Sequence, residues 1–543
     1  MRRSLSQSAT GAVDWAAIQA TERKVAHNKF RLAKSGLVQA CTRESACPSH
    51  PRFRAAYYTC VFMSHYLAID LGAESGRALL GSLSGGKLSV EELHRFPNTP
   101  VRVPGALYWD ILRLWHEIQH GIAVATRERK LTLDGIGVDT WGVDCALLGS
   151  DGLLLDNPRH YRDARNNGVM EKLFEVVPRD QVFGYTGIQF IQINTLYQLY
   201  SMRLSAAPAL GVAARMLNIP DLFNYWLTGV AKSETTIAST TQFFNPESMT
   251  WATELLQRLK IPTEMLCPIV PPGTLLGKMI EPPHTPVYAT AGHDTAAAVA
   301  AVPAGGGNES GTNWCYISSG TWSLMGLELD RPVINAQSLA ANYTNEVGVS
   351  GKIRFLKNIA GLWLLQECRK AWTLEGTEYS YEHLTRLASE ARPFSAAIDP
   401  DAYLEPGDMP AQIAGWCRSK GQAPPATHGE FARAILESLA LRYRNVLENL
   451  QALTGRKIDV IHIVGGGSRN TLLNRFVADC TGRRVVAGPS EATAIGNILV
   501  QAMGAGELAN LAEARAVVRN SFELTTVDPH PSPEWERAYQ RYF

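Results

Sequence analysis

The sequence predicts an α/β protein of two domains that face each other across a cleft. At 543 residues the chain is too long for one ordinary core. A strand-turn-strand pattern with a glycine in the turn occurs twice, at 66–83 and 314–329, roughly 250 residues apart, which indicates an ancient duplication. Strands alternate with helices after each pattern, as in two α/β units.

The amino-terminal half is expected to begin with a three-stranded meander at 66–70, 77–83 and 87–96, because these runs are apolar or alternating and are separated by glycine-bearing turns. A helix is predicted from Asp110, followed by a buried strand at 135–139. The helix is predicted from apolar residues at helical spacing, namely Ile111, Leu114, Trp115 and Ile118.

The carboxy-terminal half repeats this opening after a glycine-rich segment at 303–313. Strands at 314–319 and 322–329 flank Gly320 and Thr321, and a later strand at 459–464 precedes two helices. The predicted domains are therefore 65–306 and 307–543. Residues 1–64 are basic and lack a strand pattern, so they are expected to be an extension outside the fold, either disordered or due to a start codon assigned too far upstream of Met63.

Composition favours small-molecule chemistry in the cytoplasm. The net charge of +1 provides no basic field for nucleic acid, and no run approaches the length of a membrane span. The nine cysteines never show C-x-x-C spacing, and Cys41, Cys47 and His50 fit no standard zinc pattern.

Asp294 stands where the apolar stretch YATAGHDTAAAVAAVP (288–303) passes from a strand to a helix. A carboxylate there is explained by a helix N-cap. It is equally a candidate general base, because open α/β sheets place their chemistry at such strand ends. The stretch alone leaves both interpretations open.

Two glycine-bearing turns are candidates for phosphate binding, at DLGAESGR (70–77) and SSGTWS (318–323). The three glycines at 465–467 would let the backbone approach a flat ligand such as an adenine nucleotide. Each is also explained as a simple turn, and the turn at 70–77 lacks the Lys-Ser/Thr of a Walker loop. GVDTWGVD (137–144) sets Trp141 and Gly142 between two aspartates, which suits either a sugar site or a core tryptophan with a turn aspartate.

Together these stretches resemble the FGGY family of carbohydrate kinases. The resemblance covers about residues 65–530 and is carried in order by AIDLGAESGR, GVDTWGVD, YRDARN, GIQFIQINTLYQLY, ETTIASTTQ, HDTAAAV, YISSGTWSLMG, FLKNIAGLWLLQ and HIVGGGSRNTLLN. It implies two ribonuclease-H-like (actin-like ATPase) domains flanking a catalytic cleft, with the sugar and phosphate site in the first and the nucleotide site in the second. The implied reaction is ATP-dependent phosphorylation of L-rhamnulose at its C1 hydroxyl, giving L-rhamnulose 1-phosphate in rhamnose catabolism.

The resemblance also implies roles for residues. Asp294 would be the general base, and Asp70 would lie near Mg²⁺, through water. The phosphate and nucleotide residues would be Gly72, Ala73, Glu74, Ser75, Gly76, Arg77, Thr321, Gln366 and Gly467. The sugar site would be lined by Gly142, His293, Asp294, Thr295 and Asn358. Glu74 departs from the family pattern, because small residues are common in such turns and a negative charge sits uneasily beside phosphates.

Two alternatives remain at this point. The chain would still be a kinase of this family if it acted on L-fuculose, D-xylulose, gluconate or glycerol, because substrate choice depends on a few hydroxyl contacts. It would belong to another class if it were a non-catalytic ATP-binding protein on an actin-like scaffold.

Overall fold

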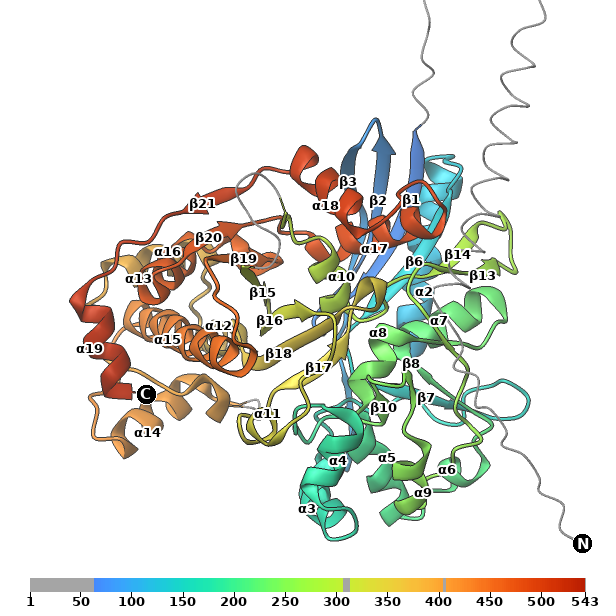
Figure 1. The fold of residues 1–543 in the computed structure, drawn as a ribbon, viewed down its shortest axis with the longest axis horizontal. Coiled ribbons are helices and arrows are strands. Elements are labelled where there is room, and N and C mark those ends of the chain that lie inside the picture. Colours follow the sequence, from blue (N-terminus) through green and yellow to red (C-terminus); the bar gives the residue numbers. More distant parts are fainter. Residues whose placement is uncertain (1–62, 306–312, 404–406, 543) are drawn as a thin grey trace, which may run out of the picture.

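Two mixed β-sheets organise the chain in the computed structural model, which describes residues 63–305, 313–403 and 407–542 (Figure 1). The predicted extension at residues 1–64 therefore lies almost wholly outside the described residues. The first sheet has the strand order β13-β14-β6-β1-β2-β3. Its strands are β1 (Ser64–Leu71), β2 (Ser75–Ser84), β3 (Lys87–Pro97), β6 (Gly135–Thr140), β13 (Thr274–Lys278) and β14 (Pro286–Ala289).

The second sheet has the strand order β17-β18-β16-β15-β19-β20-β21. Its strands are β15 (Trp314–Ser319), β16 (Trp322–Leu329), β17 (Thr344–Val347), β18 (Ile353–Ala360), β19 (Val460–Val464), β20 (Arg484–Ala487) and β21 (Thr525–Val527).

The two sheets share one topology. In the first, the antiparallel strands β3, β2 and β1 continue into β6 and β14, which run parallel to β1. In the second, β18, β16 and β15 take the same places, and β19 and β20 run parallel to β15. The predicted strands are confirmed, and the shared topology is what the predicted duplication would produce. Because β1 and β6 are parallel, Asp70 and Asp139 lie side by side at their carboxyl ends.

Helices cover both sheets. Helix α2 (Ile111–Ala123) begins after Asp110, as predicted, and the Asp110 side chain accepts a hydrogen bond from the Arg113 amide. Residues 145–258 form a helical insertion beside the first sheet that includes α3 (Val169–Phe174), α4 (Arg179–Thr186), α5 (Thr195–Leu204), α7 (Ile219–Thr228) and α9 (Thr253–Arg258). Residues after 360 contribute α12 (Trp363–Leu374), α13 (Tyr381–Glu390), α14 (Met409–Ser419), α15 (His428–Thr454), α16 (Thr471–Thr481), α17 (Ala492–Gly504), α18 (Leu511–Ser521) and α19 (Pro533–Tyr542).

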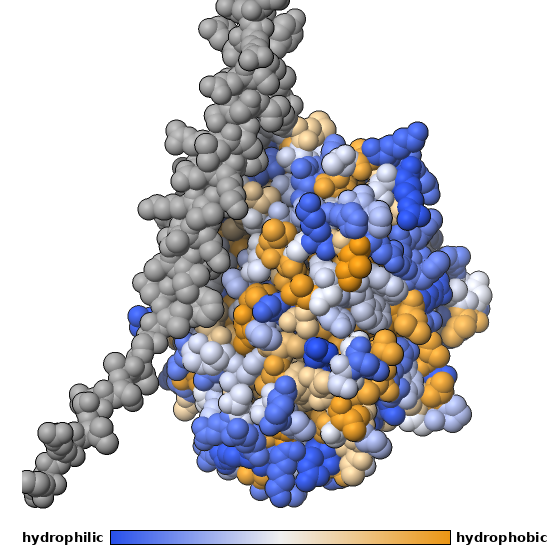
Figure 2. All heavy atoms as spheres, turned by 90° about the vertical axis from the view of Figure 1, so that its right-hand side faces the viewer, coloured by the Kyte–Doolittle hydropathy of each residue, from blue (hydrophilic) through white to orange (hydrophobic). Residues whose placement is uncertain are grey.

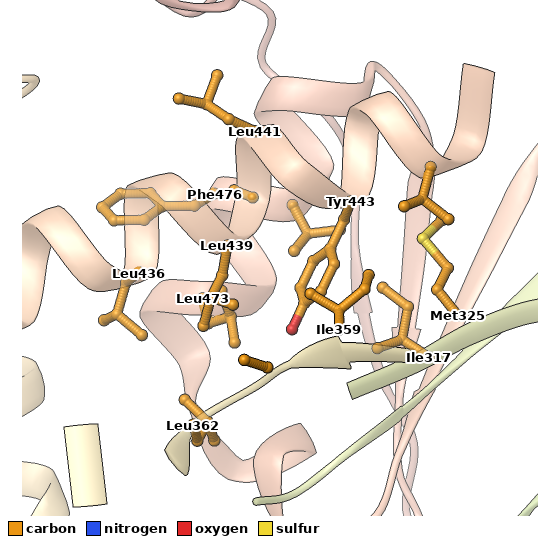
Figure 3. Close-up of a cluster of buried hydrophobic side chains, with 14 of the residues drawn as sticks. Ile317, Met325, Ile359, Leu362, Leu436, Leu439, Leu441, Tyr443, Leu473 and Phe476 are labelled. Atoms are coloured by element: carbon orange, nitrogen blue, oxygen red, sulfur yellow. The ribbon is translucent and has the colours of Figure 1, made fainter. Parts of the chain in front are cut away.

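Helix α15 packs its apolar face on the second sheet. In Figure 3, Tyr443 projects from this helix among Ile317, Met325 and Ile359 of the strands below. The Tyr443 hydroxyl lies 2.6 Å from the Ser323 Oγ, so a buried polar contact fixes the helix to β16. Ser323 pairs with Ser319, the last strand pair before the turn of Gly320 and Thr321.

Helix α17 crosses from the second half of the chain to the first sheet. In Figure 1 it lies beside β1 and β2, together with α18. The Asn497 Nδ2 donates to the Gly137 carbonyl and the Gln501 Nε2 donates to the Leu67 carbonyl, each at 3.1 Å. Helix α17 also packs on α10 (Asp294–Ala300), where a Cβ on Gly496 would overlap the carbonyl oxygen of Ala297. The two helix backbones can approach this closely only because residue 496 has no side chain.

On the side of the molecule where β13 and α7 lie, apolar and polar side chains are interspersed (Figure 2). Among the described residues, no helix is both long enough and apolar enough to cross a membrane.

We expect Gly496→Ala to destabilise the fold, because the added methyl must displace the Ala297 carbonyl. Overpacking of this kind costs about 2 kcal/mol of the free energy of unfolding, more than the helix propensity gained from alanine. Urea unfolding measures the change.

The matched control is Gly415→Ala. Gly415 is an exposed residue of α14, and its added methyl would meet no described atom within 4 Å. There the substitution should raise stability by up to about 1 kcal/mol. Equal effects of the two substitutions would contradict the packing argument.

Candidate active site

A cavity of about 280 Å³ lies between the two halves of the molecule. It opens where β1 and β6 end, beside the β15–β16 hairpin and the start of α10. Ten of the candidate residues line it, namely Asp70, Gly72, Ala73, Arg77, Gly142, His293, Asp294, Thr295, Thr321 and Asn358. Residues that are distant in the sequence thus meet at one site.

Five other candidates do not line this cavity, namely Glu74, Ser75, Gly76, Gln366 and Gly467. Gly76 lies inside β2, where a Cβ would overlap the Phe96 ring, and a Cβ on Gly467 would overlap the Ser319 side chain. These two glycines are therefore required by packing. Gly465 and Gly466 are the members of the glycine run that face the cavity.

Glu74 points away from the cavity, toward the second half of the molecule. Its Oε1 lies 3.4 Å from the Nζ of Lys370 in α12, and this lysine also pairs with Glu367 at 2.6 Å. The Glu74 side chain is 42% exposed. Its charge is thus paired and directed to the rim of the cleft, which accounts for a carboxylate in this turn.

Asp294 is the first residue of α10, and the residue in the N-cap position is His293. The prediction that Asp294 is the N-cap is therefore wrong, because the N-cap lies one residue earlier in the chain. Its Oδ1 accepts hydrogen bonds from the amide (2.5 Å) and the Oγ1 (3.0 Å) of Thr295, which orient the carboxylate. The side chain is 32% exposed and faces the cavity.

The loop before Asp294 is held by a buried glutamate. Glu234 accepts hydrogen bonds from the Gly292 amide at 2.9 Å and from the Thr236 hydroxyl at 2.6 Å. The Thr236 Oγ1 in turn accepts from the His293 amide at 3.3 Å. Burial raises the pKa of Glu234 to about 7, against the opposing effect of these hydrogen bonds. The segment ETTIASTTQ thus supports the backbone that carries Asp294.

Arg77 links the first sheet to the loop before α17. Its guanidinium pairs with Asp70 through one nitrogen and with Glu491 through the other. Burial raises the pKa of the Asp70 carboxyl, and Arg77 only partly offsets this. The neighbouring Asp139 carboxyl is fully buried, and burial together with the charge of Asp70 raises its pKa well above the ordinary value. The positive charge of Arg77 therefore partly offsets the cost of burying the Asp70 and Asp139 carboxylates side by side.

The motif GVDTWGVD divides its residues between core and cavity. The Asp144 carboxylate accepts from the indole nitrogens of Trp109 (2.6 Å) and Trp141 (2.9 Å), and burial raises its pKa to about 6. Asp144 therefore acts as the turn aspartate that supports a core tryptophan. Gly142 faces the cavity, where a Cβ would lie 3.2 Å from the Nε2 of His293.

Sequence reasoning missed Gln189, Glu346 and Arg354. The Gln189 Oε1 accepts from the Asn358 amide (2.9 Å) and from its Nδ2 (3.2 Å), so it orients a cavity side chain from the helical insertion. Glu346 and Arg354 are charged residues inside the buried strands β17 and β18. In the sequence, the only indication of this pair was that each charged residue stands within an otherwise mainly apolar or uncharged strand.

Within the described ranges no group of three or more His, Cys, Asp or Glu side chains is arranged to hold a metal ion. Asp70 faces the cavity, and the buried Asp139 Oδ1 has no hydrogen-bond partner among the described residues. One or two carboxylates suit Mg²⁺, which keeps much of its water and binds substrate phosphates. The donor set therefore fits Mg²⁺ held chiefly by a nucleotide.

Both halves match family models. Residues 65–300 match the N-terminal domain of the FGGY family of carbohydrate kinases, and residues 315–505 match its C-terminal domain. The chain belongs to this family, and it is a carbohydrate kinase.

Two relatives share most of the chain. A rhamnulokinase of Bacteroides thetaiotaomicron is 46% identical over 484 residues, covering 88% of this chain and 98% of the relative. A rhamnulokinase of Enterococcus faecalis is 39% identical, covering 86% of this chain and 94% of the relative.

Solved structures agree in fold. A ligand-bound xylulose kinase from Lactobacillus acidophilus superposes with a TM-score of 0.71 at 18% identity, covering 88% of this chain and 96% of the other. A glycerol kinase from Plasmodium falciparum, solved with ADP, superposes with a TM-score of 0.67 at 15% identity, covering 88% and 98%. The expected actin-like fold of two related domains is thereby confirmed.

We expect Arg77→Met to destabilise the protein by about 3 kcal/mol, because it leaves the buried Asp70 without its cation. Loss of Arg77 raises the pKa of Asp70 in the folded state further, so the folded protein retains a proton that the unfolded chain releases above about pH 4. The stability loss should therefore be larger at pH 8 than at pH 5, as measured by urea unfolding at both pH values.

Arg95→Met is the control for this prediction. Arg95 is half-exposed on the same sheet and pairs with Glu92 at its surface. Surface pairs contribute at most about 1 kcal/mol. A loss in Arg77→Met that did not depend on pH would contradict the role assigned to Asp70.

Proposed function

We propose that this protein phosphorylates L-rhamnulose at its C1 hydroxyl, with ATP as the phosphoryl donor, to give L-rhamnulose 1-phosphate. The single observation that carries the reaction type is the Asp294 carboxylate, which faces one cavity together with the two hairpins at Gly72 and Thr321. The choice of sugar is supported by the two rhamnulokinases, which are 46% and 39% identical to this chain over almost their whole length.

Asp294 is the proposed general base. Its carboxylate accepts the proton of the C1 hydroxyl as the oxygen attacks the γ-phosphorus and the bond to the β-γ bridging oxygen breaks. The Thr295 amide and hydroxyl keep Oδ1 in place during this step. Proton transfer of this kind contributes roughly 10²- to 10⁴-fold to the rate, and positioning contributes much of the remainder.

The other candidate residues are proposed to bind the two substrates. Backbone groups of Gly72 and Ala73, with Arg77 and Thr321, would hold the phosphates, and the Glu74–Gly76 backbone would support that turn. Gly142, His293, Thr295 and Asn358 would line the sugar site. Gln366 and Gly467 do not line the cavity, and we propose that they contact the part of the nucleotide that extends beyond it. The buried Gln366 Oε1 has no hydrogen-bond partner among the described residues.

Mg²⁺ is the proposed metal, with Asp70 holding it through water. When bound, such an ion neutralises the charge that develops on the transferring phosphoryl group. The pairing with Arg77 favours the ionised Asp70 carboxylate that this role requires and partly offsets the effect of burial.

We expect Asp294→Asn to lower kcat at least about 10²-fold, because the amide cannot accept the hydroxyl proton. The affinity for ATP should remain nearly unchanged, as measured by isothermal titration. Asp110→Asn is the matched control, because it also replaces a carboxylate at a helix start, and there the asparagine can still cap α2. Near-normal turnover in Asp294→Asn would contradict the mechanism.

A substrate panel tests the choice of sugar. ADP release with Mg-ATP should be fastest with L-rhamnulose and at least about tenfold slower with L-fuculose, D-xylulose, gluconate or glycerol. A misplaced hydroxyl leaves a buried hydrogen-bonding group of the site unpaired, which costs about 1–3 kcal/mol. A preference for another sugar would leave the kinase activity established and would show that L-rhamnulose is not the substrate. ATP binding with no phosphoryl transfer to any of them would instead favour a non-catalytic protein.

A further inference from the structure

A buried ion pair lies beside His293, on the side away from Gly142. Arg354 of β18 is fully buried, and Glu346 of β17 has a side chain that is 6% exposed. Both come from the second sheet, whereas His293 belongs to the first half of the chain. Burying two charges is costly unless their geometry is well satisfied. The roles proposed above do not use this pair.

The Arg354 guanidinium contacts both acidic and basic partners. Its Nη2 lies 3.0 Å from the His293 Nδ1 and 3.0 Å from the Glu346 Oε2, and its Nε donates to the Val347 carbonyl at 3.3 Å. A guanidinium carries only N–H donors. The His293 Nδ1 must therefore present its lone pair to Arg354, which places the ring proton of a neutral imidazole on Nε2.

Glu346 is the competing partner for this ring nitrogen. Its Oε2 lies 3.4 Å from the His293 Nδ1 and would favour a proton there. The Arg354 contact is shorter by 0.4 Å (3.4 against 3.0 Å), and two N–H groups cannot face each other at 3.0 Å. Burial raises the pKa of the Glu346 carboxyl, and the charge of Arg354, the largest opposing effect, helps to bring that pKa below its ordinary value. The Glu346 Oε2 accepts no hydrogen bond from the described residues, so Glu346 acts on the guanidinium through its charge, 3.0 Å from the Arg354 Nη2.

The Nε2 side of the ring faces the reaction. It lies 3.4 Å from the Asp294 Oδ1, and His293 and Asp294 both line the cavity. A lone pair on Nε2 would compete with Asp294 for a substrate proton, whereas an N–H there can only donate. The tautomer of His293 thus decides whether this histidine can act as a base.

We propose that Arg354, oriented by Glu346, is a positioning residue that holds His293 as the Nε2–H tautomer. His293 then donates a hydrogen bond to a sugar oxygen, and the hydroxyl proton goes to Asp294. This inference rests on the proposed sugar kinase function for its kinetic consequence. The tautomer itself is a property of the protein without substrate.

Nitrogen NMR of the unliganded full-length protein tests the tautomer directly. In ¹⁵N-histidine-labelled protein, the His293 ring signals are identified by their loss in His293→Gln. We expect a protonated Nε2 and an unprotonated Nδ1. In the double variant Arg354→Met/Glu346→Gln, which removes both charges and avoids an unpaired buried ion, this single tautomer should be lost. A protonated Nδ1 in the native protein, or an unchanged tautomer in the double variant, would overturn the proposal.

Kinetics test the consequence, with the sugar that the substrate panel identifies. The double variant should raise KM for the sugar and lower kcat by about 10- to 100-fold, with KM for ATP unchanged. In a His293→Gln background the same double substitution should add no further loss, because the residue to be positioned is gone. An additive loss would show that the pair acts without His293 and would also overturn the proposal.

The matched control is Arg433→Met/Glu437→Gln. In this pair Glu437 is buried and the Arg433 side chain is 11% exposed; the two are joined at 2.7 Å within α15 and are not among the residues that line the cavity. It should change neither the tautomer nor the kinetics. Arg354→Lys should recover part of the native tautomer, since an ammonium can still donate to Nδ1. Failure of the sugar panel leaves the NMR result intact, so the two proposals fail separately.

Discussion

The contact between α10 and α17 is the constraint on which the site depends. Gly496 lets the two helix backbones meet, and α10 begins at Asp294 itself. Glu491, directly before α17, pairs with Arg77. The same short stretch of chain therefore fixes the carboxylate of the proposed base and the cation beside Asp70. The close contact of these two helices, which come from different halves of the chain, thus ties the start of α10 to the loop before α17.

Buried carboxylates surround the cavity, and the structure separates their tasks. Glu234 and Asp144 hold a loop and two tryptophans, and both have raised pKa values because of burial. Asp70 faces the cavity and needs Arg77 to compensate its charge. Asp294 is the most exposed of the four. The least buried of these acids is thus the one that we propose as the general base, while Glu234 and Asp144 support the structure around it.

Local pattern was enough to predict the strands, the duplication and most of the cavity, because alternation, glycine turns and family motifs are encoded along the chain. It could not separate Gly76, which packs against Phe96, from a phosphate-binding glycine, because both look alike in sequence. It also missed Gln189, Glu346 and Arg354. Their partners Asn358 and His293 lie far away in the chain, and only tertiary packing brings them together.

The Glu74–Lys370 pair has a consequence of a different kind. It joins the turn after β1 to α12 at the rim of the cleft, and both side chains are about half exposed. Dissolved ions screen such a pair, whereas they reach the buried Asp70 carboxylate beside Arg77 poorly. Ionic strength therefore acts on the mouth of the cleft and not on its floor. At high ionic strength the Glu74–Lys370 pair weakens, while the buried groups beneath it keep their arrangement.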